Sequence, residues 1–277
     1  MNPTTLRTIH MTTNLVHRFV YFVPEAAEEY LALGITGRAA YFASRTAPMG
    51  VVPDEVILAT FYNFSERAVR SANIAEAWSK ASPEQIQAAR FRAVRRALDR
   101  VGVSYTVDEI AEVRELIDPV VAGLGLAGKP LAAANAAVAL PQDPLVALWQ
   151  QVTVIREWRG DAHIALLVAN SVGPCDCMVL QVGTGRFPLE ITKATRQWNE
   201  DEWAESVRDL AARGWVGPDA AMTPEGTAAR EHIEDETDRL CAPIWKPIGD
   251  SRAARLAELL ERIHPAFVAA GTYGAFM

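Results

Sequence analysis

The stretch from Trp198 to Leu240 constrains the fold of this chain more than any other. Trp203, Val207 and Leu210 recur at intervals of four and three residues, which is typical of one buried face of a helix over 199–214. The short segments 215–216 and 221–222 could pair as a stunted β-wing, and Thr223 followed by Pro224 is a typical start of a new helix. The segment therefore predicts a helix, a short wing and a second helix.

The charge of this segment limits its function. Residues 198–240 hold four arginines, no lysine and twelve carboxylates, a net charge of −8. The whole chain has a net charge of −7. Residues 1–130 are balanced, so all the excess acid lies in the second half. An acidic protein avoids nucleic acid unless it has a local basic face.

Helix-start signals recur along the rest of the chain. Ser82 with Gln85, Thr106 with Glu109 and Asn199 with Glu202 have the spacing of helix N-terminal caps. The predicted helices cover 14–33 with a break at Pro24, 54–64, 83–100, 107–122, 144–158, 161–169, 199–214, 223–241 and 251–270. We therefore expect a mainly α fold with winged-helix-like domains and at most a short β-wing.

A glycine-rich connector over 123–130 is the best candidate for a domain boundary. It would separate an N-terminal helical domain, residues 1–125, from a C-terminal winged-helix-like domain, residues 131–277. The runs ALGITG (32–37) and ANSVGP (169–174) each follow a helical segment. A tandem pair of related halves is therefore a hypothesis that the sequence leaves open.

Several classes of site lack sequence support. Three cysteines, two of them at 175 and 177, make neither a disulfide framework nor a four-ligand zinc site. The chain has no glycine-rich nucleotide loop and no paired-histidine motif, so we expect no metal and no cofactor. It has no apolar run of the ~18 residues that a membrane span needs and no signal-peptide pattern at its start, which predicts a cytoplasmic protein without membrane contact.

The first candidate site is an aromatic and polar cluster in the N-terminal half. Helical spacing places His17 with Tyr21, and Tyr41 with Arg45, on shared faces, and Asn63 lies in the aromatic run FYNF at 61–64. Aromatic walls with a few convergent polar groups are typical of a small-molecule site. The alternative is an ordinary aromatic core in which Arg45 forms a buried salt bridge.

The second candidate site is the run REWRGDAH at 156–163. Asp161 beside His163, with Arg159 next to them, could make the imidazole a general base. The alternative is that Asp161 caps a helix by accepting backbone N–H bonds and that His163 simply packs.

Residues 154–240 resemble the MarR-type winged-helix regulators. The resemblance rests on LAARGWV (210–216), on MTPEG (222–226) and on HIALLVA (163–169), which is similar to the first helix of the helix-turn-helix. The runs YFVPE (21–25), YFASRTAPMG (41–50) and FYNF (61–64) are similar to an actinobacterial group of helix-turn-helix proteins. The resemblance implies a regulator that dimerises and binds DNA.

This sequence departs from the MarR pattern where DNA would bind. The wing GPDAA (217–221) has no basic side chain, and the recognition-helix equivalent begins with three acids at 200–202. Phosphate neutralisation supplies most non-specific DNA affinity, so this surface would repel DNA. Arg92, Arg95, Arg96 and Arg100 share one helix face, which is either a salt-bridged surface or a phosphate-binding one.

The sequence therefore supports two functions. The first is a small-molecule-binding protein, an enzyme or a resistance binder of secondary metabolism, whose ligand is aromatic or polyketide-like. The second is a ligand-responsive, MarR-like DNA-binding regulator. We expect a homodimer in either case.

Overall fold

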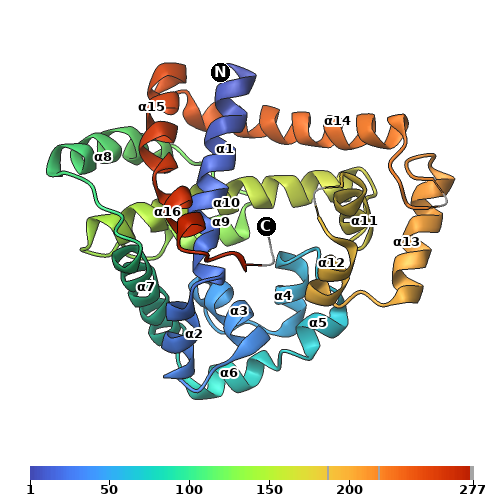
Figure 1. The fold of residues 1–277 in the computed structure, drawn as a ribbon, viewed down its shortest axis with the longest axis horizontal. Coiled ribbons are helices and arrows are strands. Elements are labelled where there is room, and N and C mark those ends of the chain that lie inside the picture. Colours follow the sequence, from blue (N-terminus) through green and yellow to red (C-terminus); the bar gives the residue numbers. More distant parts are fainter. Residues whose placement is uncertain (186, 218, 275–277) are drawn as a thin grey trace.

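The computed structural model describes residues 1–185, 187–217 and 219–274, and helices dominate it (Figure 1). The α-helices are α1 Pro3–Arg18, α2 Pro24–Leu31, α3 Gly37–Thr46, α4 Asp54–Thr60, α5 Glu66–Arg70, α6 Ile74–Lys80, α7 Pro83–Arg100, α8 Val107–Ala122, α9 Pro130–Ala136, α10 Pro144–Ala169, α11 Asp176–Gly183, α12 Leu189–Arg196, α13 Glu200–Ala212, α14 Pro224–Cys241, α15 Gly249–Glu261 and α16 Ile263–Ala269. Three short 3₁₀ segments, Phe19–Tyr21, Ala47–Met49 and Ala242–Trp245, continue α1, α3 and α14.

Helix α10 is the central axis of the molecule (Figure 1). It packs against α1, α7, α8, α9 and α14, and its apolar residues lie on all of its faces. The sequence prediction of two helices, 144–158 and 161–169, is wrong, because one helix of 26 residues runs through Gly160 and Asp161. The carboxylate of Asp161 caps a different helix, as described below.

The predicted caps are confirmed at four helix starts. Ser82 with Gln85, Thr106 with Glu109 and Asn199 with Glu202 form complete capping boxes. The Thr223 side chain accepts a hydrogen bond from the backbone N–H of Gly226 at the start of α14. Local sequence thus determines where α7, α8, α13 and α14 begin.

The break expected at Pro24 is confirmed, because α2 begins at that residue. Other helix boundaries differ from the prediction. Helix α1 begins at Pro3 and not at Asn14, and the Asn2 side chain accepts from the Thr4 N–H at its start. The expected helix over 251–270 divides at Arg262 into α15 and α16. Helix α4 ends at Thr60, four residues earlier than predicted.

Two hydrophobic cores lie on either side of α10. The larger one joins α1–α9 to most of α10 and to α15 and α16. The smaller one joins the end of α10 to α11, α13 and α14, with Trp203 and Leu210 of the predicted α13 stripe buried in it. The division into domains 1–125 and 131–277 stays a prediction.

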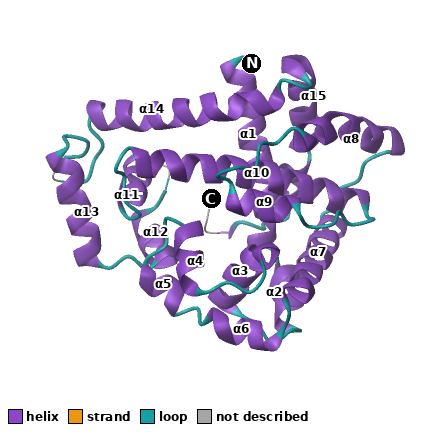
Figure 2. Ribbon diagram, turned by 180° about the vertical axis from the view of Figure 1, so that it is seen from behind, coloured by secondary structure: helices purple, strands orange, loops and turns teal. Residues whose placement is uncertain are grey.

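The predicted wing is reduced to a single bridge. Val216 and Met222 form an isolated antiparallel β-bridge (Figure 2). Among the residues that the structure describes, there is no β-strand beyond this single bridge. Pro218 of the expected wing lies outside the described residues.

The loop between α4 and α5 connects the two parts of the chain. Tyr62 Oη donates to the carbonyl oxygen of Val172 at 2.6 Å. The indole N–H of Trp198 donates to the carbonyl oxygen of Asn63 at 3.1 Å. Ser65 Oγ donates to the Gln197 carbonyl in the turn between α12 and α13. These bonds hold residues 61–65 against the second core.

Candidate functional site

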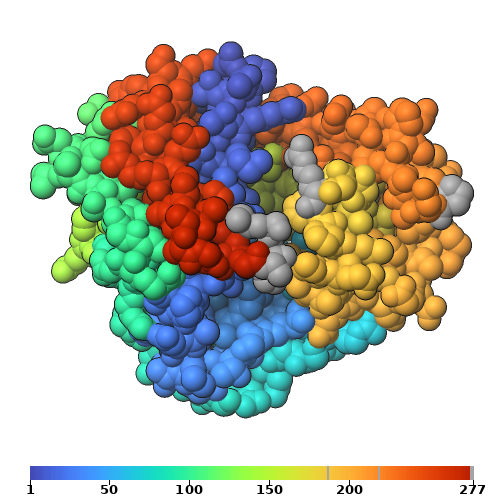
Figure 3. Space-filling model, viewed as in Figure 1, coloured from blue at the N-terminus to red at the C-terminus, as the bar shows by residue number. Residues whose placement is uncertain are grey.

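A cavity lies between the two cores and has two adjoining lobes. The inner lobe, about 250 Å³, reaches from Tyr41 and Arg45 to His163 on α10. The outer lobe, about 580 Å³, is bordered by α1, α3, α11 and α12. Figure 3 shows a hollow between α1 and α11 with α10 at its floor. The two lobes share eight lining residues: Tyr41, Arg45, Asn63, Phe64, Arg156, Met178, Gln181 and Arg196.

Seven of the eight sequence-predicted site residues line this cavity. Tyr41, Arg45 and Asn63 line both lobes. Asp161 and His163 line the inner lobe, and His17 and Tyr21 line the outer lobe. Arg159 lines neither lobe. The structure thus brings the two predicted clusters, one within residues 17–63 and the other at 161–163, to one space.

Arg45 and Glu157 form a buried ion pair at the centre of the cavity wall. Arg45 Nη2 donates to Glu157 Oε1 at 2.7 Å, and the side chains are 8% and 4% exposed. Arg45 Nη1 donates to Tyr41 Oη at 3.0 Å, and its guanidinium lies over the rings of Tyr21, Tyr41 and Phe61. The sequence left open whether Arg45 lines a pocket or forms a buried salt bridge. In the structure it does both.

Glu157 also pairs with Arg156, so two guanidinium groups share one carboxylate. Burial alone would raise the pKa of Glu157, but Arg156 and Arg45 hold that pKa well below its ordinary value. Burial would likewise raise the pKa of Tyr41, yet Arg45 and Arg196 lower it. The cavity therefore has a positive electrostatic potential at its centre.

His17 and Tyr21 belong to a chain of hydrogen bonds that sets their proton positions. Thr153 Oγ1 donates to the Trp149 carbonyl, so it accepts from His17 Nδ1–H at 3.0 Å. His17 Nε2 then accepts from Tyr21 O–H at 2.8 Å, and Tyr21 Oη accepts from Arg90 at 3.2 Å. Burial holds the pKa of His17 well below its ordinary value. A neutral His17 therefore fixes the direction of the Tyr21 hydroxyl.

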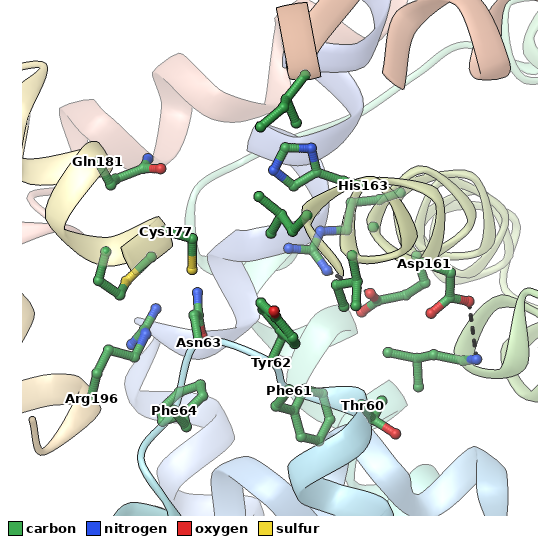
Figure 4. Close-up of a pocket in the computed structure, with 18 of the residues that line it drawn as sticks. Thr60, Phe61, Tyr62, Asn63, Phe64, Asp161, His163, Cys177, Gln181 and Arg196 are labelled. Carbon is green, nitrogen blue, oxygen red and sulfur yellow. Dashed lines mark hydrogen bonds and ion pairs between the residues drawn. The ribbon is translucent and has the colours of Figure 1, made fainter. Parts of the chain in front are cut away.

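Asn63 and Arg196 face the cavity where its two lobes meet. Figure 4 shows the Asn63 side chain pointing into the space below Cys177, with Arg196 beside it. The Asn63 carboxamide makes no hydrogen bond to a described residue, although its backbone carbonyl accepts from Trp198. The guanidinium of Arg196 lies 4.3 Å from the centre of the Phe64 ring, and its buried Nε has no hydrogen-bond partner.

Asp161 caps helix α9 from the side. Its Oδ2 accepts the backbone N–H groups of Leu131 and Ala132 at 3.1 and 3.0 Å (Figure 4). Burial raises the pKa of Asp161 to about 6, which the two N–H bonds only partly offset, and Glu157 raises it further. Asp161 thus accepts backbone N–H bonds as a helix cap, which was the alternative to a catalytic role. The helix that it caps is α9 and not its own helix.

His163 is bonded to α14 and not to Asp161. Thr237 Oγ1 donates to the Ile233 carbonyl and accepts from His163 Nδ1–H at 3.0 Å. Nε2 of the neutral imidazole is therefore an acceptor at the cavity wall. Burial lowers the pKa of His163, although Glu234 raises it in part. The expected carboxylate–imidazole pair of Asp161 and His163 is not formed.

Arg159 belongs to a separate ion-pair network on α14. It donates to Glu234 at 2.9 Å and to Asp238 at 3.2 Å. His10 Nδ1 lies 3.4 Å from Asp238, and His10 Nε2 accepts from the Trp245 indole N–H. Two carboxylates of α14, those of Glu234 and Asp238, are therefore neutralised by the same guanidinium group.

Sequence reasoning missed most of the charged lining of the outer lobe. Arg18 ends α1, Arg38 begins α3, and Arg196 ends α12. No local pattern connects them, because they are up to 178 residues apart. Arg156 and Glu157 lay inside the run that we singled out, but their adjacency gave no sign that both face one cavity.

Helices α12 and α13 are joined by a tight turn at residues 197–199. Gln197 adopts a left-handed backbone conformation in this turn, with φ of 56°. The run 163–169, which resembles the first helix of a helix-turn-helix, is the end of α10, and α11 and α12 lie between it and α13. The exposed face of α13 presents Asp201, Glu205 and Asp209 at four-residue spacing, and none of them forms an ion pair with a described residue. Helix α13 lies at the edge of the molecule (Figure 1). This helix, in the recognition position, is therefore acidic towards solvent.

The arginine face of α7 is neutralised by neighbouring acids. Arg92 and Arg96 bind Glu29, Arg96 also binds Glu28, and Arg100 binds Glu25, all on α2. Arg95 pairs with Asp99 and Asp143. Of the two interpretations of this face, the salt-bridged one is confirmed.

Comparison with protein families gives one match, to the helix-turn-helix family, over residues 6–274. The chain belongs to the helix-turn-helix family. No curated protein matches it, and no solved structure does. A helix-turn-helix family is compatible with DNA as a partner, and the match does not extend to MarR-type specificity. Among the described helices, none combines the length and apolar character that a membrane span requires.

Proposed function

We propose that this helix-turn-helix protein binds an aromatic small molecule in the cavity between its two cores. The observation that carries the proposal is the convergence of Tyr21, Tyr41, Arg45 and Asn63 on one enclosed space. The two lobes, about 250 and 580 Å³, together have the size of a typical ligand site. An aromatic or polyketide-like metabolite matches the aromatic walls, and the protein would act in the cytoplasm as a resistance binder or an enzyme of secondary metabolism.

If the protein turns its ligand over, the titratable groups of the inner lobe are the candidates. His163 offers Nε2 as a proton acceptor, and its lowered pKa keeps it neutral at neutral pH. Asp161, with a pKa of about 6, is the second acid–base candidate. Arg159 would act as a positioning residue, because it holds Glu234 beside His163.

The test is the binding of phenylnaphthylamine, an uncharged dye that fluoresces in apolar surroundings. We expect saturable binding to the wild-type protein. Gln181→Trp, which fills the junction of the lobes, should abolish it. Val168→Trp is the matched control, because Val168 is 59% exposed on α10. Equal binding to both variants would contradict the proposal.

The second candidate function is a ligand-responsive DNA-binding regulator of the MarR type. The family match favours it, because helix-turn-helix scaffolds commonly bind DNA. The regulator would act as a homodimer, which light scattering of the purified protein tests directly. The acidic face of α13 disfavours it. A regulator must form a saturable, salt-sensitive complex with duplex DNA.

A further inference from the structure

The charge of the outer lobe has the opposite sign to the charge of the chain. The described residues that line it include five arginines and no carboxylate: Arg18, Arg38, Arg45, Arg156 and Arg196. The chain as a whole has a net charge of −7. Arginines grouped around an enclosed space cost free energy through desolvation and mutual repulsion unless anions compensate them.

The protein compensates only part of this charge. Glu157, in the wall of the inner lobe, forms ion pairs with both Arg45 and Arg156. Arg18, Arg38 and Arg196 form no ion pair with any carboxylate in the described part of the chain. Arg38 donates one hydrogen bond to the Thr195 carbonyl, which carries no net charge. Three guanidinium groups around the lobe therefore have no anionic partner among the residues that the structure describes.

The hydrogen-bonding atoms of the site are incompletely satisfied as well. The Nε atoms of Arg18, Arg45 and Arg196 are buried and have no hydrogen-bond partner among the described residues. Buried polar groups are normally hydrogen-bonded, so the protein itself does not fully satisfy the guanidinium groups around this lobe. The unpaired carboxamide of Asn63 adds a neutral donor at the junction of the lobes.

Aromatic rings hold two of these guanidinium groups in place. Arg196 lies over Phe64 at 4.3 Å, and Arg18 lies over Tyr273 at 5.1 Å. A ring against the guanidinium face leaves the N–H groups at the edges available, and these edges match the geometry of a carboxylate or a phosphate. The arginines are thus oriented before any ligand arrives, which lowers the entropic cost of binding.

We propose that the ligand is an aromatic acid whose anionic group, a carboxylate or a phosphate, is held at the junction of the two lobes by Arg196, Arg45 and Asn63. Arg156 also lines this junction, and Arg18 and Arg38 border the outer lobe. The aromatic body contacts Phe64, Met178 and Ile191, which line the outer lobe. This inference rests on the proposed function, because it names the chemical class of the ligand in the same cavity.

The test compares two dyes of the same aromatic body in chloride buffer free of phosphate and sulfate. Anilinonaphthalene sulfonate carries a negative charge, and phenylnaphthylamine carries none. We expect the sulfonate to bind at least about tenfold more tightly. Equal affinity for the two dyes would overturn the anionic class while leaving the cavity as a ligand site. Binding of neither dye would overturn the proposed function itself.

Arginine variants locate the anion. Arg196→Gln should lower the affinity for the sulfonate about tenfold and leave the affinity for the uncharged dye unchanged. Arg114→Gln is the control, because Arg114 is 70% exposed on α8. An unchanged sulfonate affinity in Arg196→Gln would overturn the assignment of Arg196, and Gln181→Trp must abolish the signal if it comes from the cavity.

Stability of the ligand-free protein separates a binding role from a structural one. Arg196→Gln removes a desolvated cation without an anionic partner, so its urea midpoint should equal or exceed that of the wild type. A marked loss of stability would mean that Arg196 serves the fold. Benzoate and phenyl phosphate, but not the uncharged benzamide, should displace the sulfonate. The more potent of these two anionic competitors then shows whether the ligand carries a carboxylate or a phosphate, and equal displacement by benzamide would overturn the anionic class.

Discussion

The cavity and the exposed face of α13 carry opposite charges in one chain. The outer lobe of the cavity is lined by five arginines, whereas α13, in the position where a helix-turn-helix protein reads DNA, presents Asp201, Glu205 and Asp209 to solvent. A cation attracts anions most strongly where water is excluded. This difference is the basis of our proposal that the anion recognised by this protein is a small molecule inside it and not a phosphate backbone outside it.

Removing the cavity's central cation should have the largest effect. Arg45→Met leaves the buried Glu157 with Arg156 as its remaining partner, and we expect a loss of about 3 kcal/mol in the free energy of unfolding. Urea denaturation followed by circular dichroism measures it. Arg255→Met, which breaks an exposed pair with Glu112 on α8, is the control and should change stability little. An equal loss in the two variants would contradict the central position of Arg45.

An acid inside the cavity should respond to pH differently from an acid on α13. Burial raises the pKa of Asp161 to about 6, so its ionisation opposes folding, and this contribution to stability declines as pH rises from about 4 to about 6. Asp161→Asn cannot ionise, so it removes that decline. The difference in the free energy of unfolding between Asp161→Asn and the wild type should therefore become more favourable to the variant, by on the order of 2 kcal/mol, when the pH is raised from 4 to 7.

The matched control for this pH dependence is Asp201→Asn on the exposed face of α13. Its pH profile of unfolding free energy should run parallel to that of the wild type. If the Asp161→Asn profile is also parallel to the wild-type profile, Asp161 does not carry the raised pKa.

Reversing the charge of α13 should raise the affinity of the protein for DNA. The triple variant Asp201→Lys, Glu205→Lys and Asp209→Lys places three cations on one helix face. We expect non-specific duplex affinity to rise by at least about tenfold at low salt, with a steeper salt dependence. Glu84→Lys, Asp108→Lys and Glu261→Lys, scattered over other helices, give the same net charge as a control. Equal DNA affinity of the two triple variants would assign the effect to net charge alone.

Disruption of the arginine face of α7 should change neither the stability of the protein nor its binding of the dyes. Arg92→Ala breaks a pair with Glu29 at the surface, where Arg92 is 52% exposed. We expect a urea midpoint within measurement error of the wild type and no change in dye binding. A loss of DNA affinity in this variant would instead mark α7 as a phosphate-binding surface.

Local signals in the sequence predicted much of the fold. The three capping boxes and the Trp203–Leu210 stripe depend on residues within a few positions of one another. The prediction of a helix break before Asp161 was wrong because Asp161 caps α9, thirty residues away in the sequence. An aspartate that caps a distant helix has the same local sequence pattern as one that begins its own helix.

The site was predicted in part for a similar reason. Helical spacing paired Tyr41 with Arg45 and His17 with Tyr21, and both pairs are hydrogen-bonded. The convergence of Arg18, Arg38 and Arg196 depends on the packing of α1, α3 and α12, which no local pattern records. The separation of Asp161 from His163 follows from their spacing of two residues, which places them on different sides of α10.

The most direct test of this account is a fluorescence-anisotropy titration of the wild-type protein with labelled duplexes, at low and at moderate salt. One duplex has a random sequence, and the other is taken upstream of the protein's own gene. The account predicts no saturable binding of either duplex, even at low salt, because α13 repels phosphate and the α7 arginines are paired. Binding that weakens steeply with salt and prefers the upstream sequence would contradict it and make the cavity the effector site of a regulator.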